Sequence, residues 1–345
     1  MKKPFSALLA VLTLIGTTLS LSVLAEEPEL KDPVPATYTV VKGDTLWDIS
    51  STFLKNPWLW PEIWHVNAQI QNPHLIYPGD VIRLIYVEGK PRLTLDTSGR
   101  IYKLSPQARV LSQGEAISTI PLDEINSFLS RSRITEPGEL EAAPYVLAGM
   151  DEHLIVGAGD RLYARGTFEE GPKVYGVYRK GEDFIDPETG EHLGVLAEDI
   201  GTTSLLTTEG EVSTLKVSRT TEEIRAGDRF LRQEERAIDS TFYPSAPSTD
   251  IHAVILAVEK GLHQVGNLDV VVINRGEREG MVPGNVLAIY KRGGRIRDRV
   301  TGERVNLPDE RAGILMVFRV FDKVSLGIVL EAYRGISVAD KVQNP

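Results

Sequence analysis

The second half of the chain repeats its own residue pattern, and this repeat constrains the fold more than any other feature of the sequence. The letters YRKG at 178–181 return as YKRG at 290–293, a shift of 290 − 178 = 112 residues. At the same shift, Asp186 and the TGE at 189–191 return as Asp298 and the TGE at 301–303. Further pairs are VS at 212 and 324, Asp228 with Asp340 and, at a shift of 109, Asp160 with Asp269. A register held over this length with only small gaps predicts two copies of one domain, at residues 144–232 and 251–345.

Each copy consists of short apolar runs that are separated by glycines and turn residues. In the second copy the expected strands are residues 253–258, 268–274, 286–290, 314–320 and 326–332. The letters DPETGE at 186–191 and DRVTGE at 298–303 are typical of hairpin tips, with Thr-Gly at the bend. We therefore predict small, mostly antiparallel β domains, joined by a Pro/Ser-rich linker at residues 233–250.

The amino terminus has the order of a secretory signal peptide. Lys2 and Lys3 precede an apolar run, and Val23 and Ala25 are small residues at the −3 and −1 positions of a cleavage site after Ala25. A membrane anchor is the alternative, but a spanning helix needs about 20 apolar residues, and threonines and serines interrupt this run. We predict a signal peptide at residues 1–25 and a secreted mature protein.

Composition narrows the possible partners. The chain has no cysteine, which excludes a lipid anchor on a cysteine and leaves each domain to be held by its own apolar core. The formal net charge is −10, and loss of Lys2 and Lys3 makes it −12, so a nucleic-acid partner is unfavourable. The acidic, Pro-rich letters EEPELKDPVPA at 26–36 predict an extended linker.

Residues 37–86 form a compact window that begins YTVVKGDTLWDIS and closes with IYPGDVIRL. A short strand over 38–41 is followed by a turn in which Asp44 or Thr45 can cap a helix. Leu46, Ile49 and Phe53 give that helix one buried face. A second helix is expected at 62–68, and the turn at Pro78 leads into a returning strand. The predicted order is βααβ, which makes the whole chain α+β.

The opening letters of this window and its closing Pro-Gly-Asp turn resemble the LysM family, over about one seventh of the chain. The resemblance implies binding of N-acetylglucosamine-containing glycans, here peptidoglycan, in a shallow groove between two loops, with no cofactor, metal or catalytic group. Backbone groups at the turns would bind acetamido groups, and Leu46 and Ile76 would cover the acetyl methyl. Carried over by position, the groove residues are Gly43, Asp44, Thr45, Leu46, Ile76, Tyr77, Pro78 and Gly79.

The window departs from the family between its helices, where LKNPWLWP at 54–61 is long and aromatic. Trp47 lies in the family motif and is expected in the core. Trp58 and Trp60 either pack this enlarged loop or offer a stacking face to a sugar or partner. Residues 87–143 are predicted to be a connecting segment. Its expected parts are two strands over 92–110 with a Ser98-Gly99 turn, a short helix at 118–129 and a loop at 136–143.

The residue types of the chain give little support for a catalytic function. A cysteine nucleophile is absent, which excludes cysteine peptidases and L,D-transpeptidases. The histidines show no metal-ligand spacing, and His65 and His74 are expected to be surface or packing residues of the window. The one basic cluster, KRGGRIRDR at 291–299, is either a solvated hairpin or a docking patch for an acidic partner. We predict that the protein is not an enzyme.

A LysM-like module followed by duplicated β domains resembles the type IV pilus secretin-associated proteins (TsaP), whose C-terminal part is similar to the flagellar protein FlgT. The carrying stretches are YTVVKGDTLWDIS and VGNLDVVVINRGEREGMVPGNVLAIYKRG. The resemblance implies a periplasmic, cell-wall-associated scaffold that anchors an outer-membrane secretin to peptidoglycan. Two alternatives stay open: a scaffold for another envelope machine, and a regulator of a separate wall hydrolase.

Overall fold

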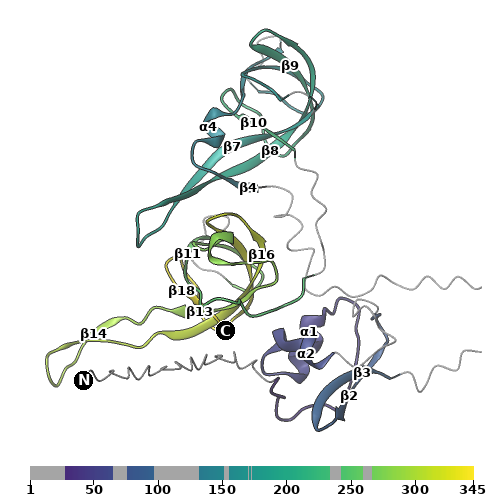
Figure 1. Ribbon diagram of the computed structural model, residues 1–345, viewed down its shortest axis with the longest axis vertical. Helices are drawn as coiled ribbons and strands as arrows, with labels where there is room; N and C mark the ends of the chain where they lie inside the picture. Colours follow the sequence, from purple (N-terminus) through teal and green to yellow (C-terminus); the bar gives the residue numbers. More distant parts are fainter. Residues whose placement is uncertain are drawn as a thin grey trace, which may run out of the picture.

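The computed structural model describes residues 28–64, 76–96, 132–150, 155–169, 171, 173–233, 242–258 and 266–345. They form a small N-terminal module with helices and a sheet, followed by two β-barrels made of antiparallel strands (Figure 1). The predicted signal peptide, the Ser98-Gly99 turn and the helix at 118–129 lie outside the described residues. Among the helices of the described part, none has the length and apolar character needed to span a bilayer.

The N-terminal module follows the predicted order with an added strand. Its elements are β1 (Thr37–Thr39), α1 (Leu46–Phe53), the 3-10 turn η1 (Pro57–Leu59), α2 (Trp60–Ile63), β2 (Val81–Val87) and β3 (Lys90–Leu95). The strands form an antiparallel sheet in the order β1-β2-β3. The second helix begins earlier than the expected residue 62, because Pro61 is well suited to the first turn of a helix. Residues 65–75 are not described.

The third strand corrects the prediction for the segment after residue 86. Strand β3 pairs back onto β2 through a two-residue turn in which Glu88 and Gly89 both have positive φ, 52° and 79°. Such a turn matches the twist of a hairpin. Leu93 is fully buried in the core of this module. The prediction missed this pairing because Glu-Gly is a weaker turn signal than the Ser-Gly that follows.

The first barrel contains β4 (Ser132–Thr135), α4 (Glu139–Ala142), β5 (Tyr145–Gly149), β6 (Arg161–Arg165), β7 (Val174–Ile185), β8 (His192–Glu209), β9 (Val212–Thr220) and β10 (Arg229–Arg232). Its sheet order is β4-β8-β7-β10-β5-β6-β9, and β8 also pairs with β9, which closes the ring. The expected loop at 136–143 contains the short helix α4, so that prediction was wrong. Gly138 at its N-cap has φ 86°, a conformation that glycine adopts without strain.

The second barrel contains β11 (His252–Val258), β12 (Val270–Ile273), the 3-10 turn η4 (Glu277–Glu279), β13 (Val286–Lys291), β16 (Glu310–Val320), β17 (Ser325–Ala332) and β18 (Lys341–Gln343). These strands close in the order β11-β12-β17-β16-β13-β18. Between β13 and β16, β14 (Arg295–Arg297) and β15 (Arg304–Asn306) form a hairpin. Leu268, expected in a strand, instead lies in a turn with φ 67°.

The two barrels have the same strand connectivity in the described residues. The ring β5-β6-β9-β8-β7-β10 of the first corresponds, strand for strand, to β11-β12-β17-β16-β13-β18 of the second. An ion pair between Arg179 and Asp228 (2.9 Å) has its counterpart, 112 residues later, between Lys291 and Asp340 (3.2 Å). Residues related by the sequence shift therefore hold like positions in the tertiary structure.

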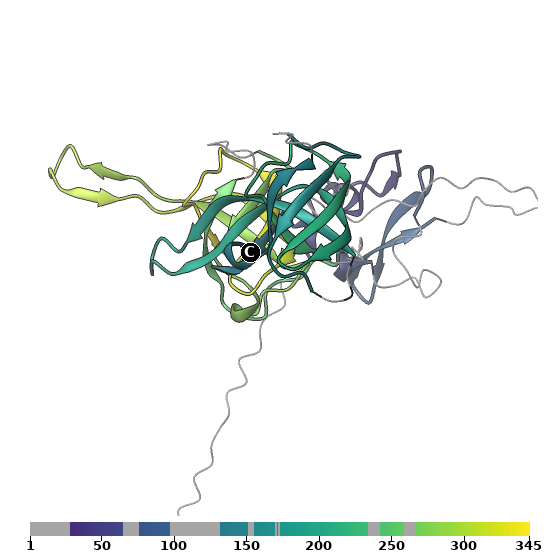
Figure 2. The ribbon, with the colours of Figure 1, turned by 90° about the horizontal axis from the view of Figure 1, so that it is seen from above.

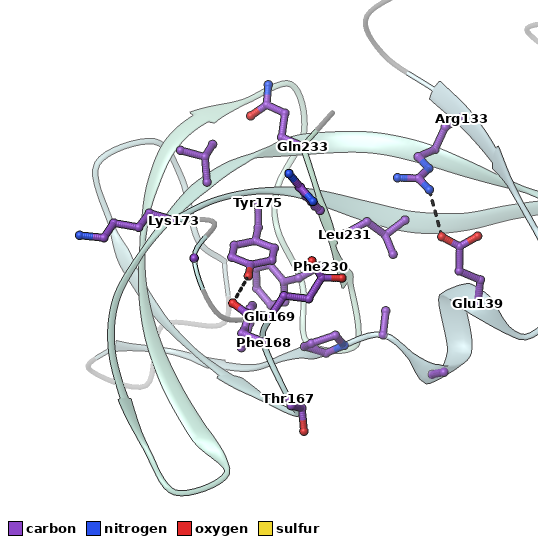
Figure 3. Close-up of a pocket in the computed structure, with 16 residues that line it drawn as sticks. Arg133, Glu139, Thr167, Phe168, Glu169, Lys173, Tyr175, Phe230, Leu231 and Gln233 are labelled. Atoms are coloured by element: carbon purple, nitrogen blue, oxygen red, sulfur yellow. Dashed lines mark hydrogen bonds and ion pairs between the residues drawn. The ribbon is translucent and has the colours of Figure 1, made fainter. Parts of the chain in front are cut away.

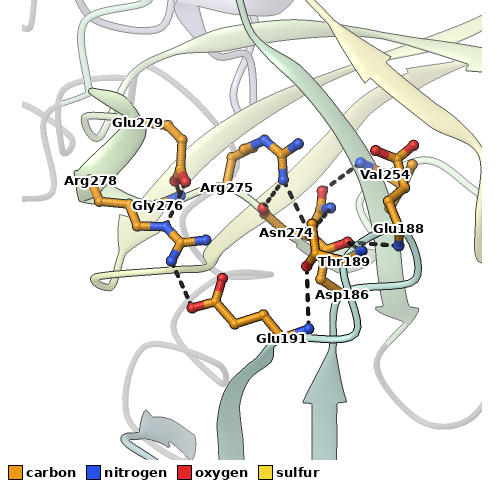
Figure 4. Close-up of polar contacts among 10 residues, drawn as sticks. All are labelled: Asp186, Glu188, Thr189, Glu191, Val254, Asn274, Arg275, Gly276, Arg278 and Glu279. Atoms are coloured by element: carbon orange, nitrogen blue, oxygen red, sulfur yellow. Dashed lines mark hydrogen bonds and ion pairs between the residues drawn. The ribbon is translucent and has the colours of Figure 1, made fainter.

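The hairpin tip between β7 and β8 is inserted against the second barrel (Figure 4). The carboxylate of Asp186, only 3% exposed, accepts hydrogen bonds from its own turn, the backbone N–H groups of Glu188 (2.8 Å) and Thr189 (3.1 Å). Its second oxygen accepts from the side chains of Asn274 (3.0 Å) and Arg275 (3.4 Å) in the other barrel. Burial works against ionisation, but these donors together hold the pKa of Asp186 below its ordinary value.

Two cations of the second barrel complete this contact. Glu191, at the end of the same tip, pairs with Arg278 (2.8 Å) and Lys323 (3.2 Å), which lower the pKa of its carboxyl group. The corresponding tip of the β14–β15 hairpin lies in solvent, and Val300 there is 94% exposed. Figures 1 and 2 both show this hairpin projecting from its barrel. The basic cluster at 291–299 lies on it, and its role as a docking patch stays a prediction.

Candidate glycan-binding site

Two loops of the N-terminal module lie side by side. The N–H of Gly79 donates to the carbonyl of Val40 (2.8 Å), and the N–H of Val40 donates to the carbonyl of Asp80 (2.9 Å). These backbone bonds join the turn after β1 to the turn before β2. The sequence prediction placed the groove between these loops, and the structure does bring the two together.

The first loop is shaped by a glycine and an aspartate. Gly43 has φ 99°, a left-handed conformation that residues with a Cβ adopt only with strain. The carboxylate of Asp44 accepts the N–H of Val41 (2.7 Å) and the hydroxyl of Tyr38 (3.0 Å). Burial, and then the nearby Asp44 carboxylate, raise the pKa of Tyr38, so its hydroxyl remains a donor. The side chain of Asp44 is therefore engaged in fixing the turn.

The second loop is built in the same way around Asp80. Its carboxylate accepts the N–H of Tyr77 (3.0 Å), and its own N–H donates to the carbonyl of Tyr77 (3.0 Å). Gly79 between them has φ 94°. Asp80 was not among the predicted groove residues, although the Pro-Gly-Asp letters contain it. Its part is to hold the backbone of the turn.

The predicted groove residues divide into an accessible and a buried set. Gly43, Pro78 and Gly79 are exposed, and Asp44 and Tyr77 are half-buried. Leu46 and Ile76 are both 0% exposed, so the expectation that they cover an acetyl methyl was wrong: their side chains fill the module's core.

Thr45 also corrects the prediction, which placed it among the groove residues. Its side chain is 4% exposed and accepts the N–H of Asp48 (3.2 Å), while the carboxylate of Asp48 accepts the N–H of Thr45 (3.0 Å). This is the capping box that starts α1. Of the two cap candidates, Asp44 and Thr45, the structure thus selects Thr45.

The surface that remains for a ligand consists of backbone with apolar flanks. The backbone groups of Lys42 and Gly43 make no hydrogen bond to another residue of the described ranges. The same two loops carry exposed Val41 and Pro78 and half-buried Tyr77. Peptide N–H and C=O groups match the acetamido group of N-acetylglucosamine, and such apolar surfaces can cover a sugar face.

The tryptophans of the module are all buried. Trp47 is in the core, as predicted, and Trp58 and Trp60 also pack there, which decides between the two alternatives left open for them. The indole N–H groups of Trp58, Trp60 and Trp64 have no hydrogen-bond partner in the described structure. Trp60 also lies 6.1 Å, centroid to centroid, from the ring of Tyr243 in the inter-barrel segment.

Metal ligands show no clustering in the part of the chain that is described. There, no group of three histidine, aspartate or glutamate side chains is arranged to hold an ion. His192 and His252 each approach a single aspartate, Asp183 at 3.1 Å and Asp250 at 3.3 Å. His65 and His74 lie outside the described residues.

Comparison with known proteins agrees with the geometry of the two loops. The LysM domain family matches residues 38–84. A Bacillus subtilis protein, the uncharacterized protein YqbP, is 40% identical over 60 residues, which cover 14% of this chain and 27% of that relative. The similarity to this relative is thus confined to a minor part of each protein. Residues 38–84 are a LysM domain, a module that binds peptidoglycan and other N-acetylglucosamine-containing glycans.

Proposed function

We propose that this protein is a non-catalytic, peptidoglycan-binding component of the cell envelope. The observation that carries the proposal is the pair of joined loops at 41–44 and 77–79, in which the backbone groups of Lys42 and Gly43 bond to no other described residue. Hydrogen bonds from these groups would select the acetamido group, and no bond in the glycan needs to be broken. The absence of cysteine and the histidine spacing in the sequence support a binding role.

The two barrels are proposed to be duplicated copies that form the protein-binding part of the molecule. Their common strand order and the ion pairs repeated at a shift of 112 support the duplication. The partner proposed is an outer-membrane secretin, so that the LysM domain would anchor the secretin to the wall. This choice rests on the resemblance to the type IV pilus secretin-associated proteins. A scaffold for another envelope machine and a regulator of a wall hydrolase are the alternatives.

The proposed location is the periplasm, at the cell wall, after cleavage of a signal peptide behind Ala25. The order of Lys2, Lys3, the apolar run and the small residues Val23 and Ala25 supports it. Mass spectrometry of the mature amino terminus tests the cleavage, and a mature protein that still begins at Met1 would contradict it.

Glycan binding is tested by Tyr77→Ala in the full chain, measured by co-sedimentation with purified sacculi. Loss of the ring's apolar contact and of any bond from its hydroxyl should weaken binding by on the order of 1–2 kcal/mol, roughly tenfold in affinity. The matched control is Tyr86→Ala, because Tyr86 lies exposed on β2 of the same module. If both variants bind sacculi as the unaltered chain does, the glycan surface lies elsewhere.

The partner is tested with residues 132–345, which begin at β4 because that strand pairs with β8. Beads carrying this fragment should retain the secretin from detergent-solubilised outer membranes, whereas beads carrying residues 28–96 should not. Retention by neither fragment would remove the secretin from the proposal. A change in wall-hydrolase activity on adding the protein would favour the regulator instead. Release of soluble fragments from sacculi by the purified protein would contradict the proposal that it is non-catalytic.

A further inference from the structure

In the second barrel, an extended segment of the chain itself crosses the face between η4 and the carboxyl terminus. The N–H of Ser245 donates to the carbonyl of Gly284 (3.0 Å), and the N–H of Val286 donates to the carbonyl of Ser245 (2.9 Å). Phe242, Pro244 and Pro247 of this segment are buried. Residues 242–250 thus form a short parallel bridge with the start of β13 and fill the surface beside it.

Two asparagine side chains hold this segment. The amide of Asn285 donates to the hydroxyl of Ser245 (3.3 Å). Asn344 accepts the N–H of Ile251 (2.8 Å) and donates to the carbonyl of Thr249 (3.0 Å). The bound segment is neutral from Phe242 to Thr249. The uncharged side-chain amides of Asn285 and Asn344 therefore suit an uncharged segment.

At the equivalent face of the first barrel, the described residues leave a cavity of about 1280 Å³ (Figure 3). Its lining includes Thr167–Glu169, Lys173 and the end of β10. Half-buried Phe168 lines this cavity and packs against the buried rings of Tyr175 and Phe230, at centroid distances of 4.9 Å and 5.5 Å. The residues that precede β5 take another course than those that precede β11, because β4 pairs with β8 and α4 lies at the edge of the cavity.

The positions of the two asparagines are occupied by cations in the first barrel. The shift of 112 relates Asn285 to Lys173 and Asn344 to Arg232, and both cations line the cavity. Both are exposed, and neither forms an ion pair with another residue that the structure describes. The other arginine at this rim, Arg133, is paired with Glu139 (3.0 Å). Among the described residues, nothing neutralises Lys173 and Arg232, which can therefore pair with carboxylates of a ligand.

We propose that this cavity is a binding groove for an extended, acidic segment of a partner protein that contains proline and aromatic residues. The segment would lie as residues 242–250 lie on the second barrel, with its apolar side chains on the half-buried ring of Phe168. Its backbone would pair with Val174, which is 44% exposed and is the counterpart of Val286. Its carboxylates would face Lys173 and Arg232, where charge-assisted hydrogen bonds replace the amide contacts.

The probe is a fluorescent peptide with the letters of residues 242–250 and Ser245→Glu, which sets a carboxylate opposite Lys173. Fluorescence anisotropy with the full chain should show saturable binding that weakens as salt is added. A neutral peptide, with Ser245 kept and Asp250→Asn, should bind at least roughly tenfold more weakly.

Protein variants place the binding in the groove. Lys173→Gln with Arg232→Gln should lower the affinity for the acidic peptide about tenfold or more. The control is Arg161→Gln with Lys216→Gln, an equal charge change at exposed positions that face each other on β6 and β9. Circular dichroism and thermal unfolding check that both variants are folded. The proposal is overturned by equal binding of the two double variants, by equal affinity of the neutral peptide, or by no binding up to about 1 mM peptide.

Discussion

The two barrels share a strand order but differ at the same two places. The tip between β7 and β8 is docked against a neighbouring domain, whereas the tip between β14 and β15 projects into solvent. Residues 242–250 cover the face beside β13, whereas the described residues leave a cavity beside β7. A common framework of alternating apolar residues thus permits different contacts, because the loops outside the core are not constrained by its packing.

The two hairpin tips share a sequence motif, so comparing them shows which contacts the motif determines. In both, the N–H of the aspartate donates to the glutamate carbonyl five residues on, at 2.8 Å for Asp186 and 2.8 Å for Asp298. Each aspartate side chain also accepts a backbone N–H two residues ahead. The motif fixes the turn but not its surroundings, since only Asp186 is buried against another barrel.

The largest expected difference between the barrels lies in their cores. Phe230→Ala should lower the free energy of unfolding by about 3–5 kcal/mol, because the ring is 1% exposed and its removal leaves a cavity under the groove. Its counterpart Val342→Ala should destabilise less, since fewer buried atoms are removed. Urea unfolding combined with hydrogen exchange on β10 and β18 measures both. Equal losses would show that the two cores are packed more alike than their residues indicate.

The next effect distinguishes the docked tip from the projecting one. Asp186→Ala should destabilise by on the order of 1–3 kcal/mol, because the amide of Asn274, itself buried, loses its acceptor. Asp298→Ala removes only contacts within an exposed turn and should change stability little. Thermal unfolding of the two variants makes the comparison. A loss for Asp298→Ala as large as that for Asp186→Ala would break the distinction between the two tips.

A smaller effect distinguishes the face that residues 242–250 cover on the second barrel from the cavity of the first barrel. Asn344→Ala should cost about 1 kcal/mol or somewhat more, because residues 249 and 251 lose their bonds to its amide. Arg232→Ala, at the corresponding position, should stay within about 0.5 kcal/mol, as expected for an exposed side chain. Hydrogen exchange at Ser245 should speed up in the first variant alone. Unchanged exchange there would mean that Asn344 does not hold the segment.

The smallest expected effect is on the stability of the protein at low pH. The folded state lowers the pKa of Asp186, so its ionised form stabilises the protein above the unfolded pKa, near 3.9. That contribution is lost as the pH falls through the lower, folded pKa. The Asp186→Asn variant has no carboxylate to protonate at this position. Its free energy of unfolding should therefore fall less than that of the unaltered chain between pH 5 and pH 2. Parallel pH profiles of the melting temperature would contradict this assignment.

The candidate site was predictable in position but not in orientation. The turns at Gly43 and Gly79 were predicted because tight turns leave a mark in the residue types, whereas their place in the groove came from the LysM resemblance. Leu46 was misassigned because the first residue of α1 points into the core, and a turn position does not reveal which way a side chain faces. Thr45 was misjudged for a related reason, since its hydroxyl is taken up by the helix cap.

By itself, the sequence determined the LysM window, the repeat of 112 residues and both Thr-Gly hairpin tips, because each is recognised from short runs of neighbouring residues. Only the tertiary structure decided that β3 joins the N-terminal sheet, that both sheets close into barrels and that one tip is buried. It also decided that residues 242–250 cover the second barrel where the described residues leave a cavity in the first. These features depend on contacts such as Asp186 with Asn274, 88 residues apart, and no local pattern records which distant surface a loop will meet.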